Sequence, residues 1–421
     1  MSEEKKRVVI VGAGFAGLAA AREFERLSRH LRNTEVVMLD RNNYHLFMPL
    51  LYQVGSGGID PGNICFPMRA MFKGGASGPP VMFHECTVLD IDTDRKVVRT
   101  DRCDSEYDYL IFAPGSTTNY YGIPDLEDNT MPLKTIKDGM AMHRRVLESF
   151  ETALLEPDEA MRSRLLTFVV VGGGATGVEV ACTLAVFVFK TLKRDFPTLV
   201  SHVRVVVVEA TNGLLGGMPS DVGRKALEQL TALGVQVMLN CRVERVDSSC
   251  IKMQDGDSIS TCNIIWVAGV RPHPLTDKLP AEKARDGRIV VDEALQAKGL
   301  PGVYVIGDCG YKMQSGGSSA YPPTAQVAVR EGKACARNIT SSIMGRPQRA
   351  FDYKYRGELI FLGRNHAVGE FGGRVIDGFP AFWLYQTYYL NRLAGFKRKL
   401  TTAIDWAYDY FYRRNTAKLD C

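Results

Sequence analysis

Short apolar runs alternate with amphipathic stretches along the chain, and this alternation predicts strands connected by helices. In the first half, a strand over residues 7–11 leads into a glycine-rich turn at 12–17 and a helix that ends near Leu27. The next strand, over residues 35–39, is followed at once by Asp40. Strand, helix and strand in this order are typical of a parallel α/β domain.

The second half of the chain repeats this arrangement. A strand over residues 167–171 precedes a glycine-rich turn at 172–177 and a long helix, and the next strand, over 203–208, ends before Glu209. The paired turns lie 160 residues apart and the paired acidic residues 169 apart. Later strands match as well, over residues 109–115 and 264–269. The sequence therefore predicts an α/β protein with two tandem Rossmann-type dinucleotide-binding domains.

Both turns have the spacing of a dinucleotide fingerprint, in which three glycines follow an apolar strand and open a helix. The glycines are Gly12, Gly14 and Gly17 in the first turn, and Gly172, Gly174 and Gly177 in the second. The first glycine permits the tight turn, the second allows the backbone to approach a pyrophosphate, and the third allows the helix to pack on the strand. We expect Asp40 and Glu209 to accept hydrogen bonds from a ribose 2′-OH. A carboxylate repels a 2′-phosphate, so Glu209 favours NADH over NADPH.

A third block indicates a flavin. Residues 303–308 form an apolar strand that ends in Asp308, whose carboxylate could bind a ribityl or phosphate oxygen. A glycine-rich loop at 315–319 and a predicted helix over 323–344 follow, and the start of that helix would face an isoalloxazine ring. Two dinucleotide sites together with this block predict a flavoprotein that uses NADH.

The C-terminal segment carries one apolar stripe at steps of three or four residues, which predicts helices. Its members are Phe382, Tyr385, Tyr389, Leu393, Phe396, Leu400, Ile404, Tyr408 and Phe411. Gly395 divides the stripe into two helices. Basic residues flank it (Lys397, Arg398, Lys399, Arg413 and Arg414), and Trp383 and Trp406 are suited to a membrane interface. An ordinary helical hairpin packed on the body, or a dimer interface, would produce the same stripe.

Charge and composition narrow the possible functions. The 421 residues have a formal net charge of +5, and residues 379–421 contribute +4 of it, so the body is nearly neutral. A basic, aromatic tail on a nearly neutral body favours a membrane anchor over a nucleic-acid binder. The ordinary composition excludes collagen-like, disordered and coiled-coil chains. We expect no signal peptide and no membrane-spanning helix, since the most apolar candidate, residues 178–189, is short and carries Glu179. The ten scattered cysteines contain no CxxC pair, so no metal site is expected.

These features resemble the type II NADH:quinone oxidoreductases, single-subunit FAD enzymes on the membrane surface. The resemblance covers nearly the whole chain. Besides both fingerprints it includes segments 43–53, 108–117, 268–272, 306–308, 322–326 and the tail block 381–414. The loop 44–53, the pair Ala325 and Gln326, and the tail are its most specific signals.

The resemblance implies roles for individual residues. FAD would contact Gly12, Gly14, Phe15, Ala16, Gly17, Asp40, Arg41, Val88, Ala113, Gly115, Asp308 and Ala325. NADH would contact Gly172, Gly174, Thr176, Gly177, Glu209, Ala268 and Gly269. Glu179 matches a catalytic carboxylate near the nicotinamide, although a carboxylate in a first helical turn could also be there only to meet the helix dipole. Gln326 matches a catalytic residue on the quinone side of the flavin.

One position departs from the family. Arg330 stands where the family usually has a second glutamine, four residues after Gln326. Its guanidinium is always charged and cannot accept a hydrogen bond. Arg330 could bind a quinone carbonyl or pair with Glu331, and it makes the identity of the quinone uncertain more than the use of one.

The resemblance further implies the domain limits and the activity. An FAD-binding domain would comprise residues 1–125 and 285–375, an NADH-binding domain 126–284, and membrane-anchoring helices 376–421. The protein would pass two electrons from NADH through FAD to a quinone in the bilayer without pumping protons. It would bind the membrane surface through residues 380–414, at the cytoplasmic face of the cell membrane, and a homodimer is compatible with the sequence. The alternatives are a sulfide:quinone oxidoreductase and a non-catalytic flavoprotein that senses NADH.

Overall fold

The computed structural model describes residues 5–31, 33–72, 81–317, 319–411 and 414–418, without the side chains of Tyr410 and Phe411. Two compact units make up the chain. The first unit is Met1–Leu46, Cys65–Thr117 and Arg271–Tyr355; the second unit is Phe47–Ile64, Thr118–Val270 and Arg356–Cys421. Ser318, within the predicted glycine-rich loop, and Arg413, among the predicted basic residues of the tail, lie outside the described residues.

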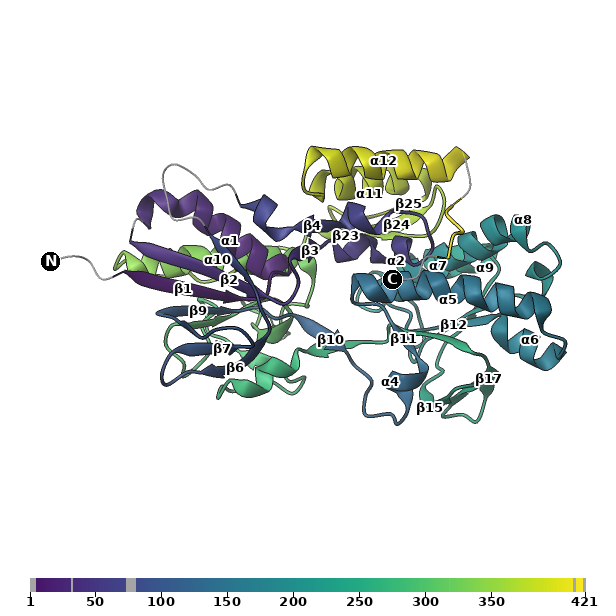
Figure 1. Ribbon diagram of the computed structural model, residues 1–421, viewed down its shortest axis with the longest axis horizontal. Helices are drawn as coiled ribbons and strands as arrows, with labels where there is room; N and C mark the ends of the chain where they lie inside the picture. The colour runs from purple at the N-terminus through teal and green to yellow at the C-terminus, as the bar shows by residue number, and fades with distance from the viewer. Residues whose placement is uncertain (1–4, 32, 73–80, 318, 412–413, 419–421) are drawn as a thin grey trace. The chain divides into compact units, whose positions relative to one another are not determined.

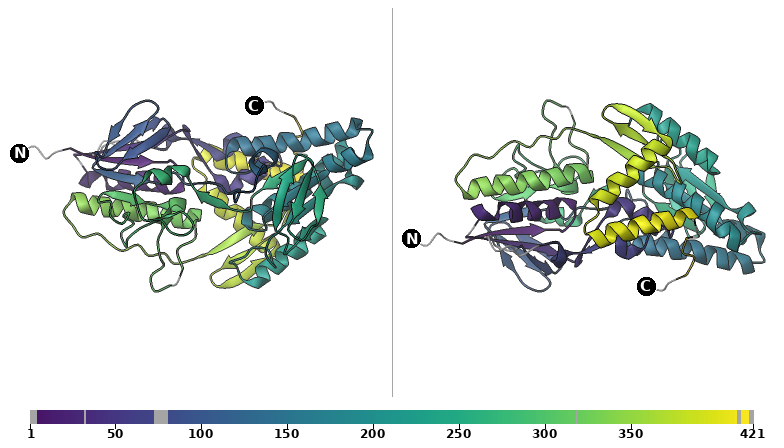
Figure 2. Two further views of the ribbon diagram at one scale, coloured as in Figure 1. Left: turned by 90° about the horizontal axis from the view of Figure 1, so that it is seen from below. Right: turned by 90° about the horizontal axis from the view of Figure 1, so that it is seen from above.

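The first unit is built on a five-stranded parallel sheet of order β21-β9-β1-β2-β5. Its strands are β1 (Lys6–Val11), β2 (Thr34–Asp40), β5 (Met82–Glu85), β9 (Tyr109–Phe112) and β21 (Val303–Val305). Helices α1 (Phe15–Leu27) and α10 (Ala325–Ile343) lie side by side on it (Figure 2). They approach closely because Gly332 has no side chain: a Cβ there would lie 2.2 Å from the carbonyl oxygen of Ala16.

The second unit contains the same sheet again, in the order β11-β18-β12-β13-β14 and also parallel. Its strands are β11 (Met131–Pro132), β12 (Thr167–Val171), β13 (Arg204–Val208), β14 (Val235–Met238) and β18 (Asn263–Trp266). In both sheets the strand before the glycine turn is central; all of β12 and the last four residues of β1 are buried, as expected for a parallel sheet covered on both faces. The predicted pair of Rossmann-type folds is confirmed.

Each half also contains a small antiparallel sheet, which precedes β9 in the first unit and β18 in the second. In the first unit it consists of β6 (Val88–Asp92), β7 (Val97–Thr100) and β8 (Ser105–Glu106). In the second unit it consists of β15 (Val243–Asp247), β16 (Cys250–Met253) and β17 (Ser258–Ser260).

Helices α5 (Ile136–Leu155), α7 (Ala175–Val186) and α9 (Ser220–Ala232) belong to the second unit. Helix α7 continues through a π-helical segment (Phe187–Leu192) into α8 (Lys193–Asp195). The combined helix Ala175–Asp195 is long and apolar enough to span a membrane by length and composition, contrary to the expectation that this segment is too short. However, 78% of its most apolar window is buried within the protein, so it packs as a core helix.

A third antiparallel sheet and two helices complete the second unit (Figure 1). The sheet contains β23 (Gly357–Phe361), β24 (Ala367–Phe371) and β25 (Arg374–Asp377), and it leads into α11 (Gly378–Arg392) and α12 (Phe396–Phe411). Strand β23 packs on α7, and β24 packs on α9 and α11. Residues 356–375 therefore belong to the second compact unit, whereas the sequence analysis assigned them to the FAD domain. The limits of the FAD-binding and NADH-binding domains stay a prediction.

The remaining elements are short. The strands are β3 (Tyr44–Leu46), β4 (Cys65–Pro67), β10 (Ser116–Thr118), β19 (Val270–Pro272), β20 (Ile289–Val290) and β22 (Gly310–Tyr311). The helices are α2 (Leu51–Val54), α3 (Pro61–Ile64), α4 (Leu126–Asn129) and α6 (Glu159–Leu165).

Candidate functional site

The first glycine turn joins β1 to α1, and two of its glycines are required by geometry. Gly12 has φ +97°, and a Cβ there would lie 2.2 Å from the carbonyl oxygen of Ala113. A Cβ at Gly17 would lie 1.9 Å from the oxygen of Gly12. Gly14 is different, because a Cβ there would meet nothing within 4 Å. The turn thus packs tightly on its inner side and is open at Gly14, where a pyrophosphate is expected.

Asp40 fastens the end of β2 to this turn. Its Oδ2 accepts a hydrogen bond from the backbone N–H of Ala13 at 2.7 Å, and its Oδ1 accepts one from the N–H of Asn42 at 2.8 Å. Burial raises the pKa of the Asp40 carboxyl, while these N–H donors and the neighbouring Arg41 act in the opposite direction.

The second glycine turn, between β12 and α7, has the same construction. Gly172 has φ +113°, and a Cβ there would lie 2.7 Å from the Cα of Ala268. A Cβ at Gly177 would lie 1.7 Å from the oxygen of Gly172, whereas a Cβ at Gly174 would again meet nothing within 4 Å.

Glu209 has the same partners in the second unit as Asp40 has in the first. Its Oε2 accepts from the N–H of Gly173 at 2.6 Å, and its Oε1 accepts from the N–H and the hydroxyl of Thr211, both at 2.8 Å. In each unit, the carboxylate thus binds the residue after the first glycine and the residue two positions beyond itself.

Asp308 lies beside the first glycine turn. The hydroxyl of Ser116 donates to its Oδ2 at 2.5 Å. The preceding residue, Gly307, has φ +69°, and a Cβ there would lie 3.2 Å from the Cβ of Ala16. Its N–H donates to Oε2 of Glu331 at 2.7 Å. Glu331 is buried, and burial raises its pKa to about 7. The sequence did not indicate this support by Glu331.

The other FAD candidates also lie in the first unit. The carbonyl of Ala113 lies under Gly12, and the carbonyl of Gly115 accepts from the N–H of His273 at 3.0 Å. Val88 begins β6 and is half-buried. All the predicted NADH contacts lie in the second unit, where Ala268 and Gly269 follow β18.

The residues present fit a dinucleotide in each unit. Neither α1 nor α7 has a side-chain cap or an acidic residue in its first turn, so the N–H groups at each helix start are available to an anion. The backbone is also open at the middle glycine of each turn. The first unit adds Asp308 and Ser116, which suit a flavin dinucleotide.

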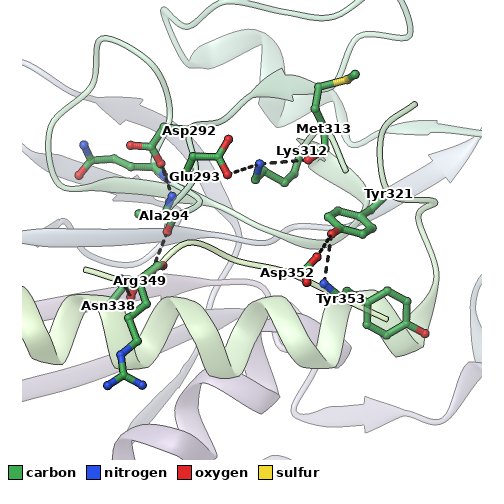
Figure 3. A network of polar contacts seen from close by, with 11 residues as sticks. Asp292, Glu293, Ala294, Lys312, Met313, Tyr321, Asn338, Arg349, Asp352 and Tyr353 are labelled. Atoms are coloured by element: carbon green, nitrogen blue, oxygen red, sulfur yellow. Dashed lines mark hydrogen bonds and ion pairs between the residues drawn. The ribbon is translucent and has the colours of Figure 1, made fainter. Parts of the chain in front are cut away.

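Gln326 lies in the first turn of α10 and accepts from Tyr353, whose own contacts with Tyr321 and Asp352 are drawn in Figure 3. The hydroxyl of Tyr353 donates to Oε1 of Gln326 at 3.1 Å. The N–H of Tyr353 donates to the Tyr321 hydroxyl at 3.1 Å, and that hydroxyl donates to Asp352 at 2.8 Å. These supporting residues give no signal in the sequence, because they come from a loop without a motif.

Arg330 is exposed on α10, one turn beyond Gln326. Glu331 turns away from it and binds the N–H of Gly307, so the alternative of an Arg330–Glu331 pair is wrong. Within the described part of the chain, the Arg330 guanidinium has no ion pair or hydrogen bond. It is therefore available to a ligand.

Glu179 is buried on α7. Its Oε1 accepts from the N–H of Phe361 at 3.2 Å and from the Tyr385 hydroxyl at 3.5 Å. Burial raises the pKa of Glu179 well above its usual value, and the nearby carboxyl of Glu358 acts in the same direction. Because α7 begins at Ala175, Glu179 falls in the second turn. The alternative of a first-turn carboxylate meeting the helix dipole is therefore wrong.

Four further side chains continue from Glu179 through the interior of the second unit. We call the set the buried polar chain: Glu179, Tyr385, Tyr52, Gln53 and Trp406. Sequence reasoning missed it as a unit, since its members come from three distant parts of the chain. The only signal was that Tyr52 and Gln53 end the loop noted for its family resemblance.

The two tail helices are confirmed, and Gly395, with φ +81°, lies between them. The single apolar stripe is divided, however. On α11, Phe382 and Tyr385 are buried, whereas on α12 the apolar side chains at steps of four are half or more exposed: Phe396, Leu400, Ile404 and Tyr408. Phe379 and Trp383 of α11 are exposed as well.

Two polar groups of the tail face inward, contrary to expectation. The indole N–H of Trp406 donates to Gln53, and Arg414 is buried. The Arg414 guanidinium binds both carboxylate oxygens of Asp409, at 2.7 and 3.0 Å, so it is not placed to meet lipid headgroups.

Comparison with known proteins agrees with this geometry. The profile of the pyridine nucleotide-disulphide oxidoreductase family matches residues 6–332. The type II NADH:quinone oxidoreductase Ndh of Mycobacterium tuberculosis is 32% identical over 97% of this chain and 89% of its own length. The mitochondrial internal alternative NAD(P)H-ubiquinone oxidoreductase A1 of Solanum tuberosum is 26% identical over 99% of this chain and 89% of its own.

Among solved structures, NDH2 from Plasmodium falciparum in complex with NADH superposes with a TM-score of 0.90. The superposition covers 99% of this chain and all of the other, at 20% sequence identity, and so supports the fold. The similarity in sequence runs through both glycine turns and on into the tail. The chain belongs to the pyridine nucleotide-disulphide oxidoreductases and, within them, to the type II NADH:quinone oxidoreductase family.

Proposed function

We propose that this protein is an FAD-dependent enzyme that oxidises NADH and reduces a quinone, without moving protons across the membrane. The observation that carries the proposal is the repeated cradle: two open glycine turns in one chain, each fastened to a carboxylate at the end of the next strand. One cradle serves FAD and the other NADH. The named relatives act on NADH or NAD(P)H and a quinone.

The chain's own residues divide this work. The first turn, Asp40 and Asp308 hold FAD, while the second turn and Glu209 hold NADH. When bound, FAD would supply the redox chemistry that links NADH oxidation to quinone reduction. Our candidates for contact with the quinone are Gln326, held by Tyr353, and Arg330, whose guanidinium has no partner among the described residues. Glu179 is our candidate for the carboxyl beside the nicotinamide.

The direct test is anaerobic NADH oxidation by the purified protein, with and without a short-chain quinone. NADPH and sulfide serve as alternative donors. Rapid, quinone-dependent loss of NADH, with much slower loss of NADPH, is the expected result. Turnover with sulfide alone would favour the sulfide:quinone alternative. Flavin reduction by NADH without reoxidation by any quinone would favour the NADH-sensing alternative.

We further propose that the exposed face of the tail binds the membrane surface. The face consists of Phe379, Trp383, Phe396, Leu400, Ile404 and Tyr408. Phe396 is 80% exposed and Trp383 is 61% exposed, although water-facing helices normally turn such side chains inward. Lys397, Arg398 and Lys399 follow at the start of α12, where they can meet anionic headgroups.

Vesicle sedimentation tests this second proposal. We expect the protein to bind anionic vesicles more strongly than neutral ones, and L400E together with I404E to abolish binding. The control is L155E, since Leu155 is also highly exposed but lies on α5. If the wild type ignores vesicles and instead sediments as a dimer that the double variant dissociates, the face is a homodimer interface.

The cytoplasmic face of the cell membrane is the location we propose, because the cytoplasm supplies NADH. Fractionation of cells followed by protease treatment of intact and opened membrane vesicles would test this. Protection in vesicles of native orientation, with cleavage after opening, is the expected pattern.

A further inference from the structure

The buried polar chain joins Trp406 on α12 to Glu179 on α7. The Trp406 indole N–H donates to Oε1 of Gln53 at 2.7 Å, and Nε2 of Gln53 donates to the Tyr52 hydroxyl at 3.0 Å. The hydroxyls of Tyr52 and Tyr385 are 2.7 Å apart. Tyr385 then donates to Oε1 of Glu179 at 3.5 Å, which makes this last bond the longest of the chain.

The Trp406 end of the buried polar chain fixes the direction of every hydrogen bond in that chain. An indole N–H can only donate, so the carboxamide of Gln53 must present its oxygen to Trp406. Its NH₂ group therefore faces Tyr52, whose oxygen accepts. The Tyr52 proton is then left for Tyr385, and the Tyr385 proton is left for Glu179.

The direction of these hydrogen bonds matters energetically, because the tyrosines of the buried polar chain are shielded from water. Tyr52 and Tyr385 are almost completely buried, so water cannot replace a missing donor. Without the indole N–H, the Gln53 carboxamide can turn over and accept from Tyr52. Tyr385 then donates to Tyr52, and among the described residues the N–H of Phe361 is the one donor left to Glu179.

We propose that Trp406 is a positioning residue, whose indole N–H sets the direction of the buried polar chain and thereby gives Glu179 its second hydrogen-bond donor. The inference rests on the proposed function in one respect, namely the role of Glu179 beside the nicotinamide. Since α12 also carries the exposed apolar face, the seating of this tail helix controls how a carboxyl on α7 is hydrogen-bonded.

Other groups also face Glu179 and must stay unchanged in the test. They are the N–H of Phe361 and the carboxyl of Glu358 on β23, Tyr389 on α11, and the Cys182 thiol on α7 itself. None of them is altered in the variants below, so a change at Glu179 reports the buried polar chain.

The test uses the flavin-loaded protein and the infrared band of the protonated Glu179 carboxyl. Burial raises the pKa of Glu179, so this band is present in mildly acidic buffer, and its loss in E179Q identifies it. Y385F removes the donor directly and should move the band to higher frequency. We expect W406F to reproduce that shift, although Trp406 does not touch Glu179. Q53M should not, because methionine has no oxygen to accept the Tyr52 proton, which therefore stays with Tyr385.

The control is W266F, which removes another indole hydrogen bond, the one from Trp266 to the carbonyl of Asn119 at 2.8 Å. It should leave the band in place. The double variant W406F/Q53M should return the band to its wild-type position, since no carboxamide oxygen is left to reverse the hydrogen bonds; a packing effect of W406F would persist in the double variant.

Turnover gives a second readout. Loss of a donor disfavours the Glu179 carboxylate and raises its pKa, so the limb of the pH–rate profile that E179Q removes should move to higher pH in W406F. If Y385F moves the band and the limb while W406F moves neither, Trp406 does not set the direction and the inference is wrong.

A failure of the proposed function gives a different pattern. In that case no quinone supports turnover in the wild type, yet the infrared comparison still decides the inference, because it needs no catalysis. If W406F fails to bind flavin or melts early, Q53E decides the result, because a carboxylate at position 53 accepts from Tyr52 and reverses the hydrogen bonds at the next link.

Discussion

At the scale of single residues, Asp40 and Glu209 show how far spacing can predict a site. Their positions at the strand ends predict contact with a nucleotide ribose. The structure adds that each is already bound by two backbone N–H groups, from the glycine turn and from the residue two positions on. That second fact depends on the fold of the turn and could not be derived from spacing.

The charge of Glu209 should decide the choice between NADH and NADPH. Glu209→Gln keeps an oxygen for the N–H of Gly173 but no longer repels a 2′-phosphate. We expect kcat/KM for NADPH to rise by about tenfold relative to NADH, equivalent to about 1.4 kcal/mol. Steady-state kinetics with both donors measure this ratio. D40N is the control: it should lower flavin content and leave the ratio unchanged.

Glu331 should make stability depend on pH. Its pKa is about 7 in the fold against 4.5 in the unfolded chain, so the native state holds the proton to higher pH. The stabilisation is complete below pH 4.5 and is lost as the pH rises to about 7, which amounts to about 3 kcal/mol.

Urea unfolding of E331Q near pH 5 and near pH 8 measures this effect. Glutamine can still accept from Gly307, so we expect the free energy of unfolding of E331Q to fall less between these conditions than that of the wild type. E282Q, at an exposed glutamate, should retain the wild-type dependence. If the free energy of unfolding of E331Q falls between the two pH values as much as that of the wild type, another group is responsible for the pH dependence.

The residues that sequence reasoning missed share a physical cause. Tyr385 lies 206 positions from Glu179 and 333 from Tyr52, and no periodicity connects them. Such contacts exist only because α2, α7 and α11 pack together. Buried hydrogen-bond networks of this kind follow from tertiary structure, whereas the glycine turns are local and leave a local pattern.

At the scale of elements, the tail shows the limit of periodicity. The stripe correctly predicts two helices, but periodicity cannot say what each helix packs against. Helix α11 lies against β24 and buries Phe382, whereas the corresponding face of α12 stays exposed at Leu400 and Ile404. Helix α10 was predicted closely: the expected range 323–344 compares with Ala325–Ile343 in the structure, where Thr324 caps the start.

Arg414 should hold the end of α12 in place. R414M removes a buried cation that binds Asp409 through two bonds and leaves that carboxylate unpaired. Because Asp409 keeps some contact with water, we expect a loss of about 2 kcal/mol, below the range for a fully buried pair. Hydrogen exchange of α12 should become faster by the corresponding factor.

R224M provides the matched comparison. Arg224 also makes two ion-pair contacts, one to Asp221 and one to Glu228, but all three side chains are exposed on α9. Exposed pairs contribute little, so R224M should leave the exchange of both helices at the wild-type rate. Equal effects of the two variants would contradict the role given to Arg414.

At the scale of the whole molecule, the internal repeat is what made the fold predictable. Two matching patterns about 160 residues apart constrain each other, and both sheets place the strand before the glycine turn at their centre. The limits of the two compact units were harder to predict from the sequence. Residues 47–64 group with the second unit although they lie between segments of the first, and no change of composition marks either crossing.

The repeat predicts that the two nucleotide sites can be disabled separately. A Cβ at Gly14 or at Gly174 meets no protein atom within 4 Å, so both alanine variants should fold. G14A should lose flavin during purification. G174A should keep its flavin and bind NADH at least about tenfold more weakly, or 1.4 kcal/mol. Flavin absorbance and NADH titration measure the two effects; loss of both nucleotides in both variants would contradict two independent sites.

The carboxylate fastened to each glycine turn also bears on the entropy of binding. A free glutamate loses rotamer freedom when a ligand orders it, which costs about 0.5–1.5 kcal/mol. Asp40 and Glu209 have already lost that freedom, because backbone N–H groups hold both oxygens of each in the folded chain. The ordering cost is met during folding, and the arriving nucleotide finds its ribose partner in a preorganised position.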